Sequence, residues 1–299
     1  MNVLKETWVG VWQRQENELE FSLELLRKNA HARRAPYRIL PSDFKKSLSV
    51  DPYALSSVLR VYPNGLEIGT VRGEYAAHTR WSKFVSIALF IFAGFVAFNL
   101  LDSVFTGSFI GTMFSALIAY FCLCVGMVFW RSAMHQVVDD PVLFNRKSRM
   151  VYARPYIYGG FCSFWVRGHH GPAVAYRWDD QIRARIYNYV YFRGANLASE
   201  GFELALLAIR DGTPSVVEQL IPLGTQANSF DSDQLSLWEH IRQYMEEGGP
   251  PLQPGDKLRA TDLSRVPEFP LEILADTGGP ALDQEAIDRL VQLKRTPGV

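Results

Sequence analysis

The sequence predicts an α+β membrane protein in which a two-helix transmembrane hairpin carries a cytoplasmic antiparallel sheet, capped by a C-terminal helix. Residues 84–105 and 109–130 are apolar runs separated by one short turn. At a rise of about 1.5 Å per residue, each run is roughly 30 Å long as a helix, which matches the hydrocarbon core of a bilayer. Several β-rich runs with Asn-Gly and Asp-Gly turns, followed by one amphipathic run, predict the capped sheet.

Charges on either side of the hairpin predict its orientation. Arg80 and Lys83 precede the first run, Arg131 follows the second, and the turn between the runs contains no Lys or Arg. Loops rich in basic residues stay in the cytoplasm. We therefore expect a protein that crosses the bacterial inner membrane twice, with both termini in the cytoplasm.

Small residues recur every fourth position in the second helix, at Gly107, Gly111, Ser115 and Ala119. Small side chains on one helix face let another backbone approach closely. The spacing suits packing against the first helix and also suits packing against a second copy of the chain. The oligomeric state is therefore left open.

Charge and cysteine content exclude several classes of protein. The 31 basic and 31 acidic residues give a formal net charge of zero, so nucleic acid is not an expected partner. Three cysteines without a disulfide spacing indicate a reducing compartment. A phosphate-binding glycine loop, a nucleophile elbow and a metalloprotease helix are all missing from the sequence. We therefore expect no enzymatic activity, no cofactor and no metal.

Changes in composition divide the chain into five segments. These are a helical and basic N-terminal extension, a β-hairpin joining the sheet, the transmembrane hairpin, a β-rich domain with its closing helix, and a Pro-rich tail. In that order they cover residues 1–56, 57–82, 83–131, 132–249 and 250–299. The extension is expected to contain a helix over residues 16–28, and the tail a short helix over 283–294. The tail is either a flexible arm or a strap over the domain.

The expected strands and closing helix follow from short patterns. Asn64-Gly65 lies between two β-rich runs, which predicts a hairpin of strands. The closing helix is expected to have its N-cap at Asp231 or Ser232 and to bury Trp238 against the sheet. In residues 182–186 the alternation predicts apolar side chains inside and arginines outside.

One aromatic strand is the candidate surface for a protein partner. Tyr187, Tyr189 and Tyr191 share one face at period two, with Arg183 and Arg185 nearby. If exposed, tyrosines rimmed by arginines suit a protein interface. If buried, the same face is part of the sheet core. Both interpretations stay open.

A membrane-tethered hydrolase using His169, His170 and Asp179 is a further hypothesis. Adjacent histidines do not converge on a metal ion, and no carboxylate or cysteine lies at a zinc-like interval from them. Paired carboxylates can do acid–base work, but a lone pair is not a motif, so Asp179 and Asp180 are better explained by a turn anchored by Trp178. The sequence thus favours a solvated loop over a catalytic site.

Certain phrases of the sequence carry a family resemblance. They are Val-Leu-Phe-Asn-Arg at 142–146, Val-Tyr at 151–152, Tyr-Arg-Trp-Asp at 176–179, and Leu-Trp-Glu-His-Ile-Arg-Gln-Tyr-Met-Glu-Glu-Gly at 237–248. These phrases resemble a domain-of-unknown-function family of proteobacterial inner-membrane proteins that are often encoded beside type VI secretion genes and their toxic effectors. The resemblance implies an immunity or accessory role and supplies no catalytic residues. The order of elements over residues 55–247 also resembles bacterial membrane proteins with a pleckstrin-homology-like domain.

The leading hypothesis is a non-enzymatic inner-membrane protein whose cytoplasmic module binds a protein partner. The partners expected are the lipid bilayer and a protein, which the family resemblance implies to be a secreted type VI effector. The alternative is a lipid- or envelope-sensing membrane regulator, whose basic cluster at residues 27–34 contacts anionic lipid.

Overall fold

The computed structural model describes residues 4–5, 19–22, 25, 35–70, 79–105, 109–135, 139–157, 169–193, 197–213, 215–224 and 230–293. The chain divides into two compact units. The sheet domain comprises residues 1–73, 139–155 and 172–299, and the hairpin unit comprises residues 74–138 and 156–171.

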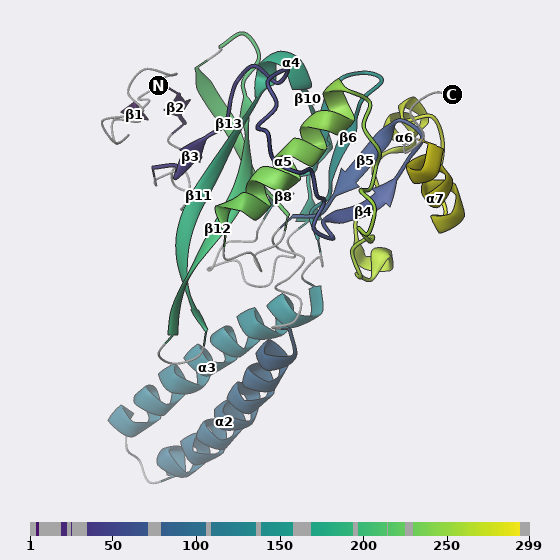
Figure 1. Cartoon of the computed structure of the whole chain (residues 1–299). Coiled ribbons are helices and arrows are strands. Elements are labelled where there is room, and N and C mark those ends of the chain that lie inside the picture. Colours follow the sequence, from purple (N-terminus) through teal and green to yellow (C-terminus); the bar gives the residue numbers. More distant parts are fainter. Residues whose placement is uncertain are drawn as a thin grey trace. The chain divides into compact units, whose positions relative to one another are not determined.

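Two long helices, α2 (Thr79–Phe105) and α3 (Phe109–His135), form the core of the hairpin unit (Figure 1). They contain the stretches Ser82–Asn99 and Phe109–Arg131, each long and apolar enough to cross a membrane. Only 11% and 17% of these stretches are buried. The prediction of two apolar helices is confirmed, and both continue about one turn past the predicted runs at the end that they share.

Close packing between α2 and α3 depends on a glycine that the sequence pattern did not single out. The Ser86 hydroxyl donates a hydrogen bond of 2.9 Å to the carbonyl of Gly126. A Cβ at residue 126 would lie 2.9 Å from the ring of Phe90, so a larger side chain there would force the helices apart. Gly126 therefore sets the approach of the two helices at this point.

The predicted small-residue face is only partly at the helix contact. Ala119 is buried, as is Ala93 of α2. Gly111 and Ser115 are half-buried, and Gly107 lies outside the described residues. The buried and half-buried members lie on the covered side of α3 within the hairpin itself.

The sheet domain contains two large sheets. In spatial order the six-stranded sheet consists of β1 (Leu4–Lys5), β2 (Glu20–Phe21), β13 (Val216–Leu223), β12 (Leu197–Ile209), β11 (Ile182–Arg193) and β3 (Arg38–Ile39). The five-stranded sheet consists of β10 (Val174–Arg177), β7 (Met150–Ala153), β6 (Val142–Asn145), β5 (Gly65–Ile68) and β4 (Val58–Val61).

The prediction of a single antiparallel sheet is wrong. Besides the division into two sheets, β13 pairs with β2 in parallel, through Val216 with Glu20 and Val217 with Phe21. Residues 20 and 21 fall within the helix predicted over residues 16–28, so that prediction is wrong there. Leu19 and Phe21 are buried by this pairing. Local periodicity favoured a helix, but the long-range contact with β13 decides the conformation.

The two predicted strand hairpins are confirmed. β4 and β5 pair around Asn64, and β6 and β7 pair around the turn at residues 146–149. Their inward side chains belong to one large core that the two sheets share. β11 and β12 form a long antiparallel pair that contributes to the same core.

The predicted closing helix is also confirmed. Helix α5 (Asp231–Glu246) packs against β12, and its N-cap is Phe230, one residue before the expected position. Trp238 is buried, and its ring stacks on Trp178 of the short helix α4 (Trp178–Gln181) at 5.5 Å between centroids. Phe44 contacts both rings, at 4.5 and 5.3 Å. This aromatic group joins α5 to the sheets.

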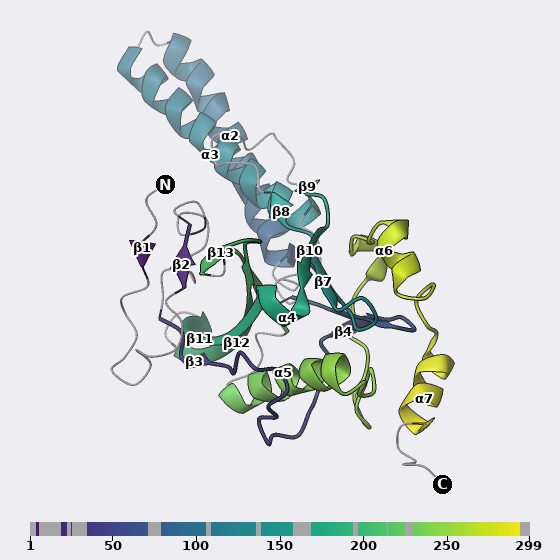
Figure 2. The same ribbon diagram turned by 90° about the horizontal axis from the view of Figure 1, so that it is seen from above.

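The Pro-rich tail is a strap rather than a flexible arm over its described residues. It contains the 3₁₀ helix η4 (Leu263–Arg265) and the helices α6 (Leu271–Asp276) and α7 (Gln284–Leu293). Figure 1 shows α6 and α7 to the right of β4 and β5, and Figure 2 shows the same two helices to the right of β4. Arg259 and Leu282 each donate a backbone hydrogen bond of 2.7 Å to the edge strand, at Val58 and Val61. We call residues 259–282 the strap.

Candidate functional site

The predicted aromatic surface is covered where the structure describes it. Tyr187 is buried in a second core that also contains Leu19 and Phe21. Arg185 is buried too, so the expectation that both arginines point outward is wrong at this residue. Arg183 is half-buried, and the side chains of Tyr189 and Tyr191 lie outside the described residues. Leu19 and Phe21, at β2, pack in the same core as Tyr187, which the alternation in residues 182–186 could not reveal.

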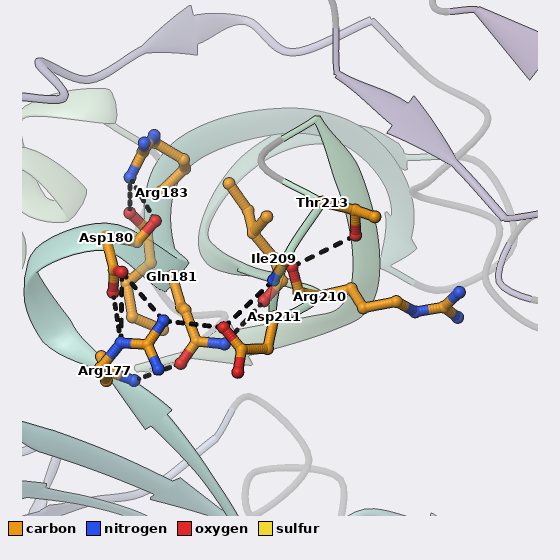
Figure 3. Close-up of polar contacts among 10 residues, drawn as sticks. Arg177, Asp180, Gln181, Arg183, Ile209, Arg210, Asp211 and Thr213 are labelled. Atoms are coloured by element: carbon orange, nitrogen blue, oxygen red, sulfur yellow. Dashed lines mark hydrogen bonds and ion pairs between the residues drawn. The ribbon is translucent and has the colours of Figure 1, made fainter.

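Several exposed charged residues lie just before β11 in the chain, and hydrogen bonds hold their side chains in place. Arg177 donates from Nε and Nη2 to Asp180, at 3.0 and 2.9 Å, and from Nη2 to Asp211 at 2.8 Å (Figure 3). The buried Gln181 accepts from the backbone of Arg177 at 2.8 Å and donates to the carbonyl of Ile209 at 3.3 Å. These contacts fix α4 between β10 and the end of β12.

A second arginine extends this charged surface. Arg149 donates to Asp179 from Nε at 2.9 Å and to Glu246 from Nη2 at 2.6 Å. Glu246 also accepts from the indole nitrogen of the buried Trp178 at 2.6 Å. Arg149 is therefore anchored to both α4 and α5. We call the five exposed or half-exposed residues Arg149, Arg177, Asp179, Asp180 and Asp211 the charged ridge.

Two carboxylates of the charged ridge, Asp179 and Asp211, are stabilised in their ionised form. Hydrogen bonds from Arg149 hold the pKa of Asp179 below its ordinary value, and hydrogen bonds from Arg177 do the same for Asp211. A carboxylate with a lowered pKa is a weak general base at neutral pH. The ridge thus suits recognition of a charged partner better than proton transfer.

The residues of the hydrolase hypothesis fall in different units. His169 and His170 form β9 of the hairpin unit, paired with β8 (Tyr156–Ile157), whereas Asp179 belongs to the sheet domain and binds Arg149. Within the described parts of the chain, no group of three or more His, Cys, Asp or Glu side chains could hold a metal ion.

Sequence reasoning missed a buried carboxylate on the outer face of the five-stranded sheet. Glu67 of β5 accepts from Arg60 at 3.0 Å and from the hydroxyl of Tyr62 at 2.8 Å. Its side chain is 0% exposed, and this burial raises its pKa to about 7. In the sequence, Glu67 stands between Leu66 and Ile68 as an outward residue of an alternating strand. Its burial depends on the strap, which is distant in sequence.

A second buried carboxylate lies where the chain passes between the sheet domain and the helices. Asp139 accepts from the backbone and the hydroxyl of Thr70, at 2.6 and 3.1 Å, and pairs with Arg259 of the strap at 3.0 Å. Thr70 precedes α2 in the chain and Asp139 follows α3. We call Thr70, Asp139 and Arg259 the junction clasp.

The junction clasp is compact and desolvated. Burial raises the pKa of Asp139 to about 6. A Cβ at Gly69 would collide with Arg259 and Asp139, so only glycine allows the chain to pass this closely. Arg259 also donates to the carbonyl of Thr70 at 3.1 Å. The clasp thus joins the strap to both segments that connect with the helical hairpin.

These observations define an α+β protein with a mixed sheet and a pair of helices long and apolar enough to span a membrane. Residues 118–270, about half of the chain, match the family of unknown function DUF6708, and the chain belongs to this family. The match runs from within α3 to the residue before α6, so it includes the charged ridge and two members of the junction clasp, Asp139 and Arg259, whereas Thr70 lies before the matched residues. It also includes every phrase that carried the family resemblance in the sequence. Searches of curated proteins and of solved structures gave no match.

Proposed function

We propose that this protein is a non-enzymatic membrane anchor for a protein-binding module. The observation that carries the proposal is the exposure of large apolar side chains along both α2 and α3. Phe95 and Phe98 on α2, and Ile110 and Phe121 on α3, are each more than 60% exposed. An apolar surface of this extent is characteristic of contact with lipid or with another protein. The core helix of a water-soluble protein would instead be mostly covered.

The orientation rests on the charges at the helix ends. Lys83 and Arg131 lie at the shared end of the hairpin, which we place at the cytoplasmic face of the bacterial inner membrane. Both termini and the sheet domain then lie in the cytoplasm, and the turn between the helices lies outside.

We propose the charged ridge as the surface that meets the protein partner. Its arginines are held by two or more acceptors each, so little side-chain entropy remains to be lost on binding. Arginines are enriched at the energetic centres of interfaces. The family resemblance found in the sequence supports a type VI secretion setting, in which the partner is a toxic effector and the protein acts as an immunity or accessory protein. Its action would be stoichiometric occlusion.

The test is recovery of the partner from the native host by a tagged full-length chain in mild detergent, with mass spectrometry. The double variant Asp180→Lys, Asp211→Lys reverses the charge of two exposed acidic residues of the ridge and changes no core residue. Exposed ion pairs contribute at most about 1 kcal/mol to stability, so the variant should still fold. Glu285→Lys is the matched control, since Glu285 is an exposed carboxylate paired with Arg289 on α7.

We expect one secreted toxin or secretion component to be recovered by the wild type and by the Glu285→Lys control, and to be lost with the ridge variant. The same proteins recovered from all three would exclude the ridge as the binding surface. Recovery of lipid alone would favour the alternative membrane-sensing regulator.

A further inference from the structure

The strap covers two buried carboxylates, each with a single arginine as its counter-ion. Glu67 pairs with Arg60 and Asp139 pairs with Arg259, and both carboxylate side chains are 0% exposed. Neither belongs to the charged ridge. Charges buried in this way occur at a cost in desolvation that one ion pair often does not offset.

The strap itself excludes water from Glu67. Phe269 is buried against Tyr62 and Leu143, and Ile273 and Leu274 of α6 pack against the same cluster. Arg60, which holds Glu67, also donates at 3.1 Å to the carbonyl of Leu263 in η4. Release of the strap would therefore return Glu67 to water.

Asp139 is tied to the strap directly, because its counter-ion is a strap residue. Asp139 Oδ2 lies 3.0 Å from Arg259 Nη1, yet this buried oxygen receives no hydrogen bond. Its other oxygen already accepts two bonds from Thr70. An underbonded, desolvated carboxylate oxygen is a favourable position for a proton.

We propose that the strap is a proton-linked latch: proton uptake by Glu67 and Asp139 tightens its attachment to β4 and β5, and proton loss loosens it. Through Arg259, the same event sets how firmly the segments at Thr70 and Asp139 are held together.

The direction of the linkage follows from the two states. With the strap closed, burial places the pKa of Glu67 at about 7 and that of Asp139 at about 6. With the strap open and the carboxylates in water, both return towards about 4. Between pH 6 and pH 8 the closed state therefore binds more protons than the open state, so lowering the pH from 8 to 6 favours closure of the strap.

Charged groups around Glu67 and Asp139 shift the pKa of each carboxyl up or down. Arg60 lowers the pKa of Glu67, and the negative charge on Asp139 raises it. Arg259 lowers the pKa of Asp139, and Asp140 raises it. The imidazole of His240 contacts Pro251, which precedes the strap, and burial lowers the pKa of His240 to about 4. His240 therefore stays neutral in the closed domain between pH 6 and pH 8.

The experiment is hydrogen–deuterium exchange of the full chain in detergent micelles at pH 6 and pH 8, followed by mass spectrometry of peptides from residues 259–282. Protection factors are corrected for the intrinsic exchange rate at each pH. We expect protection of the strap to fall about twentyfold from pH 6 to pH 8. Glu67 contributes about tenfold, because pH 6 lies one unit below its closed-state pKa of about 7, and Asp139, with a closed-state pKa of about 6, contributes about twofold.

Two neutral variants and one control make the test specific. Glu67→Gln and Asp139→Asn keep the acceptors for Tyr62 and Thr70 but remove the titration, so strap protection in the double variant should be independent of pH. Glu285→Gln removes an exposed carboxylate, ion-paired with Arg289 outside both the strap and the charged ridge, and should leave the wild-type pH dependence unchanged. Near-ultraviolet circular dichroism reports whether each variant is folded.

Equal protection at the two pH values in the wild type, or higher protection at pH 8, would overturn the latch without any variant being needed. The same conclusion would follow if the folded double variant kept the wild-type pH dependence. None of these outcomes bears on partner binding by the charged ridge, so the latch and the proposed function can fail separately.

Discussion

Replacement of Arg242 by alanine is expected to lower the free energy of unfolding of the sheet domain by about 3–5 kcal/mol, because it leaves a buried carboxylate without its counter-ion. Arg242 donates to Glu239 at 2.9 and 2.6 Å, and the two side chains are 1% and 0% exposed. Although burial acts to raise the pKa of Glu239, hydrogen bonds from Arg242 and Ser47 hold it below its ordinary value. Urea denaturation in detergent, followed by tryptophan fluorescence, measures the loss.

Two further variants separate the buried pair from general surface effects. Arg177→Ala removes an exposed arginine with two carboxylate partners and should cost no more than about 1 kcal/mol. Arg242→Met combined with Glu239→Gln removes both charges and should recover part of the loss. A small effect of Arg242→Ala, similar to that of Arg177→Ala, would show that water reaches Glu239.

Substitution of Trp238 by alanine is the other change with a large expected effect. Trp238 is buried between Phe44 and Trp178, where it links α5 to the sheets. Truncating a buried aromatic side chain costs about 3–5 kcal/mol, through lost burial and the cavity that remains. Far-ultraviolet circular dichroism during thermal unfolding measures this without depending on the removed fluorophore.

The controls for Trp238 use the same method. Trp238→Phe retains most of the apolar volume and should lose less stability than Trp238→Ala. Leu271→Ala truncates a side chain that is 83% exposed, and a change within about 0.5 kcal/mol is expected. If Trp238→Ala behaved like Leu271→Ala, the stacked aromatic group would not be what holds α5 in place.

Local sequence patterns predicted the elements that local forces determine. The apolar runs marked α2 and α3, Asn64-Gly65 marked the turn between β4 and β5, and helical spacing around Trp238 marked α5. In each case the residues that decide the structure are neighbours in the chain. The turn, cap and periodicity rules apply to such segments directly.

Contacts between distant segments were not predictable in the same way. The strand at Glu20–Phe21 forms because β13 lies beside it, although the sequence around it has helical spacing. Glu67 is buried because Phe269 and α6 cover the sheet face on which it lies. The pair between Asp139 and Arg259 joins residues that no motif connects. The alternation of apolar and polar residues predicted that the outer faces of the strands meet solvent, but distant parts of the chain cover those faces.

In the candidate site, too, local patterns were visible in the sequence and contacts between distant segments were not. The tyrosine and arginine pattern of β11 was visible in the sequence, but Tyr187 and Arg185 proved to be buried. The charged ridge was visible only as the segment around Asp179-Asp180, because Arg149 and Asp211 come from other turns of the chain. The correct expectation was that Trp178 anchors this turn, and it is fully buried.

Membrane topology is the most direct test of the account. A tandem reporter of alkaline phosphatase, active only outside the cytoplasm, and a fluorescent protein, bright only inside it, is inserted at Gly107 or fused after Val299. We predict phosphatase activity alone at Gly107 and fluorescence alone after Val299, with the chain resistant to extraction from membranes by carbonate. The reverse pattern, or recovery of the chain in the soluble fraction, would contradict the claim that α2 and α3 anchor a cytoplasmic domain.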